Sequence, residues 1–470
     1  MNIQVSEPAA GFPVENPTES YWQTPPLPIS DHRTTPHLPP TAEYCIVGSG
    51  ITGASIAYKL LNANPSAQIL MLEGRTACSG ATGRNGGHCR AGRYLSFADN
   101  LAKWGAEEAW KLEALERATV RNVVQLARDL DIPCDLVASE TADVFMDPVQ
   151  WEAALANMKA REDALAELTS ASMPEESAHD DSIRHEYKIW YAEEAREKLL
   201  FPKALGAIAF QSYTLSPYKL VCSLLEHAVQ RGMNLQTNTM VTSIDCLPAS
   251  APASQRRWTI CTARGNIQAN NVILATNAYT GALYSPLASF IIPTRGQIAV
   301  VRPGSNISGS PVLSRSCGLA DVVASPYYHS RAPGLSGEGD IVMGGGRTVA
   351  PGREQPVFDD STIHPLVSKY LTTQLAIYFG ADTWGSNPVD PVVQEWTGIM
   401  GYTRDTEPIV GQAPRREGLW ICAGFHGHGM ALAFQCAEAT VQMLMGQSDD
   451  VEKWLPQSYK LGRVPGTGFE

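Results

Sequence analysis

The sequence feature that most constrains the fold is a glycine-rich turn of the form GxGxxG at residues 48–53. A short apolar stretch, residues 43–47, precedes it, residues 54–61 have helical spacing, and residues 68–72 form a second apolar stretch before Glu73. This order predicts a βαβ unit made of strand, turn, helix and strand. In such a unit, a GxGxxG turn followed about 20 residues later by an acidic residue is typical of dinucleotide-binding domains.

Each glycine of this turn has a physical role in dinucleotide binding. Gly48 allows the tight turn, Gly50 lets the backbone approach a pyrophosphate, and Gly53 lets the helix pack on the strand. The start of the helix directs free N–H groups and a partial positive charge at the phosphates. Glu73 is expected to accept hydrogen bonds from the adenosine ribose, and its charge disfavours a 2′-phosphate. The predicted contacts are Gly48, Ser49, Gly50, Ile51, Thr52, Gly53 and Glu73.

A second glycine-dense stretch, SGATGRNGGH at residues 79–88, follows the ribose-binding acid and is called the cofactor loop below. Small residues let the backbone lie against a flat ring system and offer N–H groups to it. The alternative is a flexible surface loop, which the position directly after Glu73 disfavours. The predicted cofactor contacts of the loop are Gly80, Ala81, Thr82, Asn85, Gly86, Gly87 and His88.

The rest of the chain predicts an α/β fold in which a second, α+β domain is threaded through the first. Residues 107–129 and 149–168 have helical spacing, and residues 290–350 alternate as in an antiparallel sheet. Residues 271–276 form a continuous apolar run of the kind found in buried parallel strands. Residues 1–40 contain nine prolines and predict an extended arm, either laid over the surface or mobile.

Composition excludes several classes of function. The net charge of −12 without clustered Lys or Arg argues against nucleic-acid binding. No apolar run reaches the roughly 20 residues that span a bilayer. The ten cysteines form no CxxC pair, so neither a metal site nor a disulfide framework is expected, and a reducing compartment fits. With no recognisable targeting segment, we expect a cytoplasmic location.

Four separated motifs give the chain a resemblance to a known family. Besides the turn and the cofactor loop, they are NVILATNAYTG at residues 271–281 and WICAGFHGHGMALA at residues 420–433. Over residues 40–447 the chain resembles the D-amino-acid-oxidase-like FAD-dependent oxidoreductases, which include glycine oxidase and sarcosine oxidase. Its cofactor loop is most similar to that of gamma-glutamylputrescine oxidoreductase.

The resemblance implies a Rossmann-type FAD-binding domain interleaved with a substrate domain on a mixed or antiparallel sheet, and non-covalent FAD. From the resemblance together with the pattern of elements along the chain, we expect an arm at 1–40, an FAD domain at 41–96, 205–285 and 395–447, a substrate domain at 97–204 and 286–394, and a tail at 448–470. The resemblance also implies adenine contacts at Val241 and dinucleotide contacts at Ala275 and Thr276. The loop at residues 424–430 is expected to face the flavin pyrimidine through Gly424, Gly427, His428, Gly429 and Met430.

The resemblance further implies that a small-molecule amine or amino acid gives a hydride to the flavin, forming an imine, with O2 as electron acceptor. Our candidates for catalysis or substrate binding are His426, His428, Arg84 and Arg347. His428 could equally cap a helix, and either arginine could be a surface or ion-pair residue. Arg90 and Arg295 are weaker candidates of the same kind. The aromatic side chains Tyr327, Tyr328, Trp384 and Trp396 could form a substrate wall, but most are expected in the core.

Three departures from sarcosine oxidases leave alternatives open. Ala431 stands where those enzymes have a carboxylate-binding lysine, no oxygen-activating lysine is found near residues 340–346, and residues 396–405 contain no cysteine for a covalent link. His88 and Cys89 keep another flavin linkage possible. The alternatives are an oxidase of a larger amine metabolite, marked by a wide aromatic pocket without a carboxylate-binding arginine, a flavin-binding scaffold, and an NAD-dependent dehydrogenase.

Overall fold

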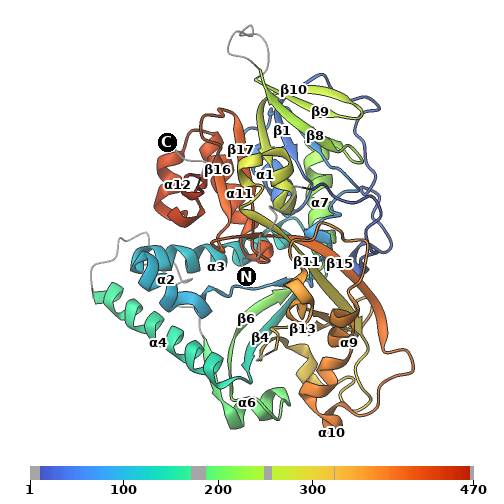
Figure 1. Cartoon of the computed structure of the whole chain (residues 1–470), viewed down its shortest axis with the longest axis vertical. Helices are drawn as coiled ribbons and strands as arrows, with labels where there is room; N and C mark the ends of the chain where they lie inside the picture. Colours follow the sequence, from blue (N-terminus) through green and yellow to red (C-terminus); the bar gives the residue numbers. More distant parts are fainter. Residues whose placement is uncertain (1–10, 171–186, 248–256, 322, 466–470) are drawn as a thin grey trace, which may run out of the picture.

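The computed structural model describes residues 11–170, 187–247, 257–321 and 323–465. The chain forms two sheets with helices packed on them, and it passes back and forth between the sheets (Figure 1). This is the interleaved α/β arrangement that the sequence predicts. The region between the two sheets holds the site described below.

The first sheet is parallel at its centre, with strand order β16-β17-β10-β1-β2-β7 and with β8 and β9 attached beside β10. Its strands are β1 (Thr41–Val47), β2 (Ile69–Leu72), β7 (Asn234–Gln236), β8 (Val241–Cys246), β9 (Trp258–Thr262), β10 (Gly265–Leu274), β16 (Ile409–Gln412) and β17 (Leu419–Ala423). The apolar runs of β1, β10 and β17 are buried because helices cover this sheet. Helix α1 (Ile51–Ala63) packs against two neighbouring helices, α7 (Pro217–Gln230) and α11 (Ala433–Leu444).

The second sheet is antiparallel except where β12 pairs with β4, and its order is β15-β11-β14-β13-β12-β4-β6-β3, with β5 on β6. Its first strands are β3 (His88–Cys89), β4 (Val137–Phe145), β5 (Lys188–Tyr191) and β6 (Gly206–Thr214). Its later strands are β11 (Ile291–Val301), β12 (Ser316–Ala320), β13 (Tyr327–Ser330), β14 (Ile341–Gly344) and β15 (Val392–Thr403).

Some of the remaining helices lie around this second sheet, and others, such as the last one, lie beside α11 at the first sheet (Figure 1). They are α2 (Phe97–Trp104), α3 (Ala106–Asp129), α4 (Pro148–Ser170), α6 (Ala192–Leu199), α8 (Thr280–Leu283), α9 (Pro365–Phe379), α10 (Ala381–Trp384) and α12 (Ser448–Trp454). Helices α3 and α4 match the predicted helices at 107–129 and 149–168 closely.

The sheet membership of three strands differs from the predicted domain boundaries. Strands β3 and β6 and most of β15 fall in segments predicted for the FAD domain, yet all three pair within the second sheet. Strand β6 hydrogen-bonds with β4 along its whole length, and β15 hydrogen-bonds with β11. The sheet to which these strands belong is therefore set by their pairing partners and not by the segment of the sequence in which they lie. The described part of the predicted tail also packs on the body, with Tyr459 and Leu461 buried and Lys460 bridged to Val410.

Candidate active site

A continuous cavity of about 1000 Å³ lies between the two sheets. One end is lined by the GxGxxG turn, Glu73 and Val241, and the other by residues of the second sheet and of α4. We call these the dinucleotide end and the substrate end. The two ends are described in turn because different kinds of groups form them.

At the dinucleotide end, the glycines of the turn are required by close backbone contacts. Gly48 has a φ of +105°, and a Cβ added there would lie 2.7 Å from the carbonyl oxygen of Ala275. A Cβ on Gly53 would lie 2.0 Å from the carbonyl oxygen of Gly48. Any side chain at Gly53 would therefore push α1 away from the turn, which is the packing role expected of this glycine.

Glu73 lies at the end of β2 and is held by donors from both neighbouring turns. Its Oε2 accepts hydrogen bonds from the N–H and hydroxyl of Ser49 at 2.9 and 2.6 Å, and its Oε1 accepts one from the N–H of Arg75 at 2.9 Å. A carboxylate has about four acceptor positions, so one remains for a ribose hydroxyl. The N–H of Ile51, the first residue of α1, donates to Thr82 Oγ1 at 3.1 Å and thereby joins the turn to the cofactor loop.

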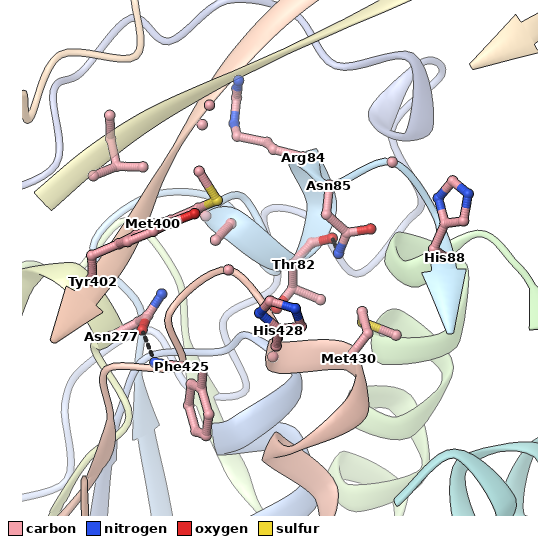
Figure 2. Close-up of a pocket in the computed structure, with 18 of the residues that line it drawn as sticks. Thr82, Arg84, Asn85, His88, Asn277, Met400, Tyr402, Phe425, His428 and Met430 are labelled. Carbon is pink, nitrogen blue, oxygen red and sulfur yellow. Dashed lines mark hydrogen bonds between the residues drawn. The ribbon is translucent and has the colours of Figure 1, made fainter. Parts of the chain in front are cut away.

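The C-terminal glycine-rich loop is fixed by Asn277, which follows β10. Asn277 Oδ1 accepts hydrogen bonds from the N–H of Gly424 at 3.1 Å and of Phe425 at 3.3 Å, the second of which Figure 2 shows. The same figure shows His428 between Phe425 and Met430 on this loop. His428 is exposed to the cavity, and its Nδ1 lies 3.1 Å from the carbonyl oxygen of His426.

His426 does not line the cavity, in contrast to His428. Its ring packs against Tyr402 with 4.1 Å between the ring centroids. Burial, followed by the nearby His428, Arg93 and Arg347, lowers the pKa of His426 to about 4. His426 is therefore uncharged at neutral pH and supports Tyr402 from behind, so the geometry favours His428 over His426 as a contact of bound groups.

Arg84 is buried at the cavity wall, and the protein itself occupies its guanidinium. Its donors reach the carbonyl oxygens of Ser79 at 2.8 Å, Thr397 at 2.7 Å and Thr18 at 2.5 Å, and Asp360 lies 3.7 Å away. Burial lowers the pKa of Arg84 to about 10, against the opposing effect of Asp360. These contacts favour a role in fixing the cofactor loop over direct binding of a substrate carboxylate.

Arg347, at the substrate end, is not committed to a protein carboxylate. No described Asp or Glu lies within salt-bridge distance of it, and its only hydrogen bond among the described residues is a long one, 3.4 Å, to the carbonyl oxygen of Arg353. Its guanidinium lies 4.8 Å from the centre of the Tyr402 ring. A half-buried cation stacked on an aromatic ring and lining the cavity can bind an anionic group.

His88 completes the substrate side of the cofactor loop. Its Nδ1 is buried without a partner among the described residues, and its ring makes edge contacts with Tyr327 and His329 at 4.9 Å. Burial, followed by His329 and Arg90, holds the pKa of His88 well below its usual value. Arg90 is paired with Asp143 at 2.7 Å, and Arg295 with Glu354 at 2.5 Å, so both have the ion-pair role considered as an alternative.

The structure brings most of the predicted residues to one cavity. Of the predicted cofactor contacts and the four leading catalytic candidates, four do not line it, namely Gly53, Gly87, Gly424 and His426; the weaker candidates Arg295, Tyr328, Trp384 and Trp396 also lie outside it. Gly424 has a φ of +75° and faces Thr403, where a Cβ would lie 2.7 Å from Cγ2, so its need for glycine is local. Sequence reasoning missed several lining residues, although Asn277 lies within the motif at 271–281. The missed residues include Asn277, Tyr279, Arg75, Met400, Tyr402, Phe12 and Pro13.

The cavity fits FAD. The close-approach glycines and Glu73 suit a dinucleotide, and the cavity continues from them to the loop at 427–430. Tyr279 and His88 line it, and each has a buried polar atom, Oη and Nδ1, without a partner among the described residues. Cys89 is buried, and burial raises the pKa of its thiol to about 12. The thiol is therefore protonated at neutral pH, which argues against a covalent flavin link formed by its thiolate.

The fold and this cavity define a dinucleotide-dependent oxidoreductase with two interleaved domains. The family described as FAD dependent oxidoreductase (DAO) matches residues 43–443, and the chain belongs to this family. FAD is therefore the cofactor, and the alternative of an NAD-dependent dehydrogenase is set aside. The protein is an enzyme of the oxidoreductase class, which also disfavours the scaffold alternative.

Two curated relatives and a solved structure resemble the chain at low sequence identity. The chain is 20% identical over 435 residues to probable oxidoreductase OrdL of Haemophilus influenzae, covering 91% of this chain and 86% of that protein. It is 22% identical over 414 residues to gamma-glutamylputrescine oxidoreductase of Escherichia coli, covering 87% and 85%. Among solved structures, glycine oxidase from Bacillus cereus has a TM-score of 0.65 at 15% identity, covering 88% of this chain and 98% of that one. These similarities at low identity support the fold.

Two other properties of the described residues bear on partners. No helix in the described ranges is both long and apolar enough to cross a bilayer. Within the same ranges, no group of three or more His, Cys, Asp or Glu side chains is arranged to hold a metal ion.

Proposed function

We propose that this enzyme oxidises the C–N bond of an amine or amino acid that carries an anionic group. The observation that carries the proposal is Arg347, a cation at the substrate end that has no counter-ion among the described residues. Its presence favours a carboxylate-bearing substrate over a larger amine metabolite, for which a wide aromatic pocket without such an arginine is expected. Two relatives, gamma-glutamylputrescine oxidoreductase and glycine oxidase, are named for amine and amino-acid substrates and support this class.

The reaction needs positioned groups more than a strong base. When bound, FAD accepts a hydride from the substrate carbon next to nitrogen. The nitrogen loses a proton to water, and the resulting imine is hydrolysed to a carbonyl compound and an amine. The two electrons and one proton of the hydride, together with the proton released from nitrogen, would then reduce O2 to hydrogen peroxide.

The chain's own residues would orient the substrate. Arg347 holds the anionic group, while Tyr402 and Met400 line one side of the cavity (Figure 2) and Tyr327 packs against His88 of the cofactor loop. His88 stays uncharged because its pKa is held well below the usual value, so it adds no positive charge that would repel a substrate ammonium. His428 and the N–H groups of its loop would face the cofactor, where negative charge develops on reduction.

The proposal is tested by anaerobic reduction of the purified, FAD-loaded enzyme. Gamma-glutamylputrescine, putrescine, sarcosine and both enantiomers of common amino acids would each be added while the visible flavin band is recorded. We expect bleaching by a compound that carries both an amine and a carboxylate, and hydrogen peroxide on admission of air. If 2-hydroxy acids bleach the band and no amine does, the proposal is wrong; if bleaching occurs without peroxide, only the O2 step is wrong.

A further inference from the structure

The cofactor loop has two faces, and its glycines divide between them. Gly80 lines the cavity, and a Cβ added there would meet no atom within 4 Å. Gly83 and Gly87 do not line the cavity. Besides nearby backbone carbonyls, a Cβ on Gly83 would lie 2.5 Å from Gln23 Nε2, and a Cβ on Gly87 would lie 3.0 Å from Trp22 Cζ2. Gly83 and Gly87 therefore leave room for the N-terminal arm as well as for these carbonyls, and the arm lies on the back of the loop.

The arm is also hydrogen-bonded to that back face. Residues 20–23 include a short 3-10 helix, Tyr21–Gln23, whose N-terminal cap is Ser20. Three side chains of this segment donate to backbone carbonyl oxygens of residues 78–85: Ser20 Oγ to Gly83 at 2.7 Å, Trp22 Nε1 to Asn85 at 2.6 Å, and Gln23 Nε2 to Cys78 at 3.0 Å. Ser20 and Trp22 are buried, so these bonds are shielded from water and costly to leave unmade.

Thr18 ties the arm to Arg84, the buried arginine of the same loop. Its carbonyl oxygen and hydroxyl accept from Arg84 at 2.5 and 3.2 Å, and its hydroxyl accepts from the N–H of Thr397 at 2.9 Å. Its own N–H donates to the carbonyl oxygen of Asp360 at 2.7 Å. Three segments far apart in sequence thus hold Arg84 in place, and the arm supplies one of them.

The start of the described arm reaches the cavity itself. Phe12 and Pro13 line it, and the carbonyl oxygen of Val14 accepts a hydrogen bond from Arg75 at 3.3 Å. Arg75 follows the ribose-binding Glu73, so this part of the arm borders the dinucleotide. Phe12 is 40% exposed, so a large apolar residue at the edge of the cavity is left partly uncovered.

We propose that residues 11–23 of the arm are part of the FAD site. They hold the back of the cofactor loop in the shape that receives FAD, and Phe12 and Pro13 form an edge that bound FAD covers. Docking of the arm and binding of FAD are then coupled, so each strengthens the other by the same factor. This proposal rests on FAD as the cofactor and does not depend on which substrate is oxidised.

The test compares FAD affinity of apo-protein variants made in the full chain. Ser20→Ala and Thr18→Val each remove the hydroxyl that contacts the loop or Arg84, and we expect about 5- to 50-fold weaker FAD binding because buried partners lose their bonds. Ser20→Thr, which keeps the hydroxyl, should restore tight binding. Tyr21→Phe is the matched control: it removes the contacts of the hydroxyl with the Ser336 carbonyl and Arg331, which lie outside the cofactor loop, and keeps the ring stacked on Trp396.

Hydrogen exchange separates coupling from a general structural role. Amide hydrogen exchange in the peptide covering residues 15–27 should slow when FAD is added to the wild-type protein. In Ser20→Ala, FAD should slow this exchange by a smaller factor. Phe12→Ala, an exposed position that does not threaten folding, should weaken FAD binding about 2- to 10-fold through lost apolar burial. Wild-type FAD affinity in Thr18→Val, Ser20→Ala and Phe12→Ala, or arm exchange that FAD leaves unchanged, would overturn the proposal.

Discussion

At the dinucleotide end of the cavity most contacts come from one stretch, residues 47–88, and most are made by backbone or by very small side chains. At the substrate end they come from separate strands and turns, such as Tyr327 on β13, Arg347 after β14, and Met400 and Tyr402 on β15. The first end is fixed by local geometry, which leaves no room for a side chain at Gly48 and Gly53. The second depends on which side chains the folded sheet brings together, so it can change specificity without loss of the fold.

The largest effect is expected from Gly53→Ala at the dinucleotide end. The new Cβ would lie 2.0 Å from the Gly48 carbonyl oxygen, so α1 must move, and such overpacking costs about 1–3 kcal/mol or more. We expect loss of FAD binding and a strongly lowered melting temperature of the apo-protein. Exposed Gly462, where a Cβ meets nothing within 4 Å, gives the control Gly462→Ala. A Gly53→Ala protein that keeps FAD would break the claim that local geometry fixes this end.

The substrate end should respond differently, through catalysis and not folding. Arg347→Ala should lower kcat/KM for an anionic substrate about 10- to 100-fold, because a charge-assisted hydrogen bond contributes about 1.5–3 kcal/mol. The flavin spectrum and the melting temperature should stay unchanged. Exposed Arg353 lies nearby but does not line the cavity, so Arg353→Ala removes the same charge as a control. Equal losses in both variants would point to long-range electrostatics instead of binding by Arg347.

These two ends also differ in how far the sequence predicts them. The turn at 48–53, Glu73 and the cofactor loop are found from the sequence because backbone geometry demands glycine at fixed spacing. Arg347 was found as one of several arginines, but nothing local distinguishes it from Arg84 or Arg90, whose partners Thr18, Thr397 and Asp143 lie far away in sequence. Met400 and Tyr402 lack a local pattern altogether, since only the pairing of β15 with β11 turns them to the cavity.

Asn277 combines features of the two ends of the cavity, because its side chain fixes the backbone of the glycine-rich loop at residues 424–430. Asn277→Ala removes the acceptor for the N–H groups of Gly424 and Phe425, so the glycine-rich loop loses its fixed position. We expect FAD affinity to fall about 10-fold, since each lost hydrogen bond costs about 0.5–1.5 kcal/mol. Asn277→Asp keeps the acceptor oxygens and tolerates the φ of +45°, so it should bind FAD more tightly than the alanine variant. Equal affinities would mean that the loop is held by its other contacts.

The smallest expected effect concerns His329, which joins the second sheet to the cofactor loop. Its Nε2 lies 2.8 Å from the carbonyl oxygen of Gly86, and burial lowers the pKa of His329 to about 4. In the unfolded chain a histidine has a pKa of about 6.5, so between pH about 6.5 and 4 the unfolded state binds more protons than the folded state. The contribution of neutral His329 to stability is therefore complete above pH 6.5 and is lost progressively as the pH falls toward 4.

Thermal unfolding of the apo-protein at several pH values measures this contribution. The wild-type melting temperature should fall between pH 7 and 4.5, and His329→Gln should make that fall shallower, while exposed His37→Gln leaves it unchanged. His88 and His426 also have lowered pKa values, so the slope should shrink without vanishing. If the melting temperature of His329→Gln falls with pH as steeply as that of the wild type, His329 has the same pKa in the folded and the unfolded state. The link from the second sheet to the cofactor loop would then not depend on a neutral imidazole.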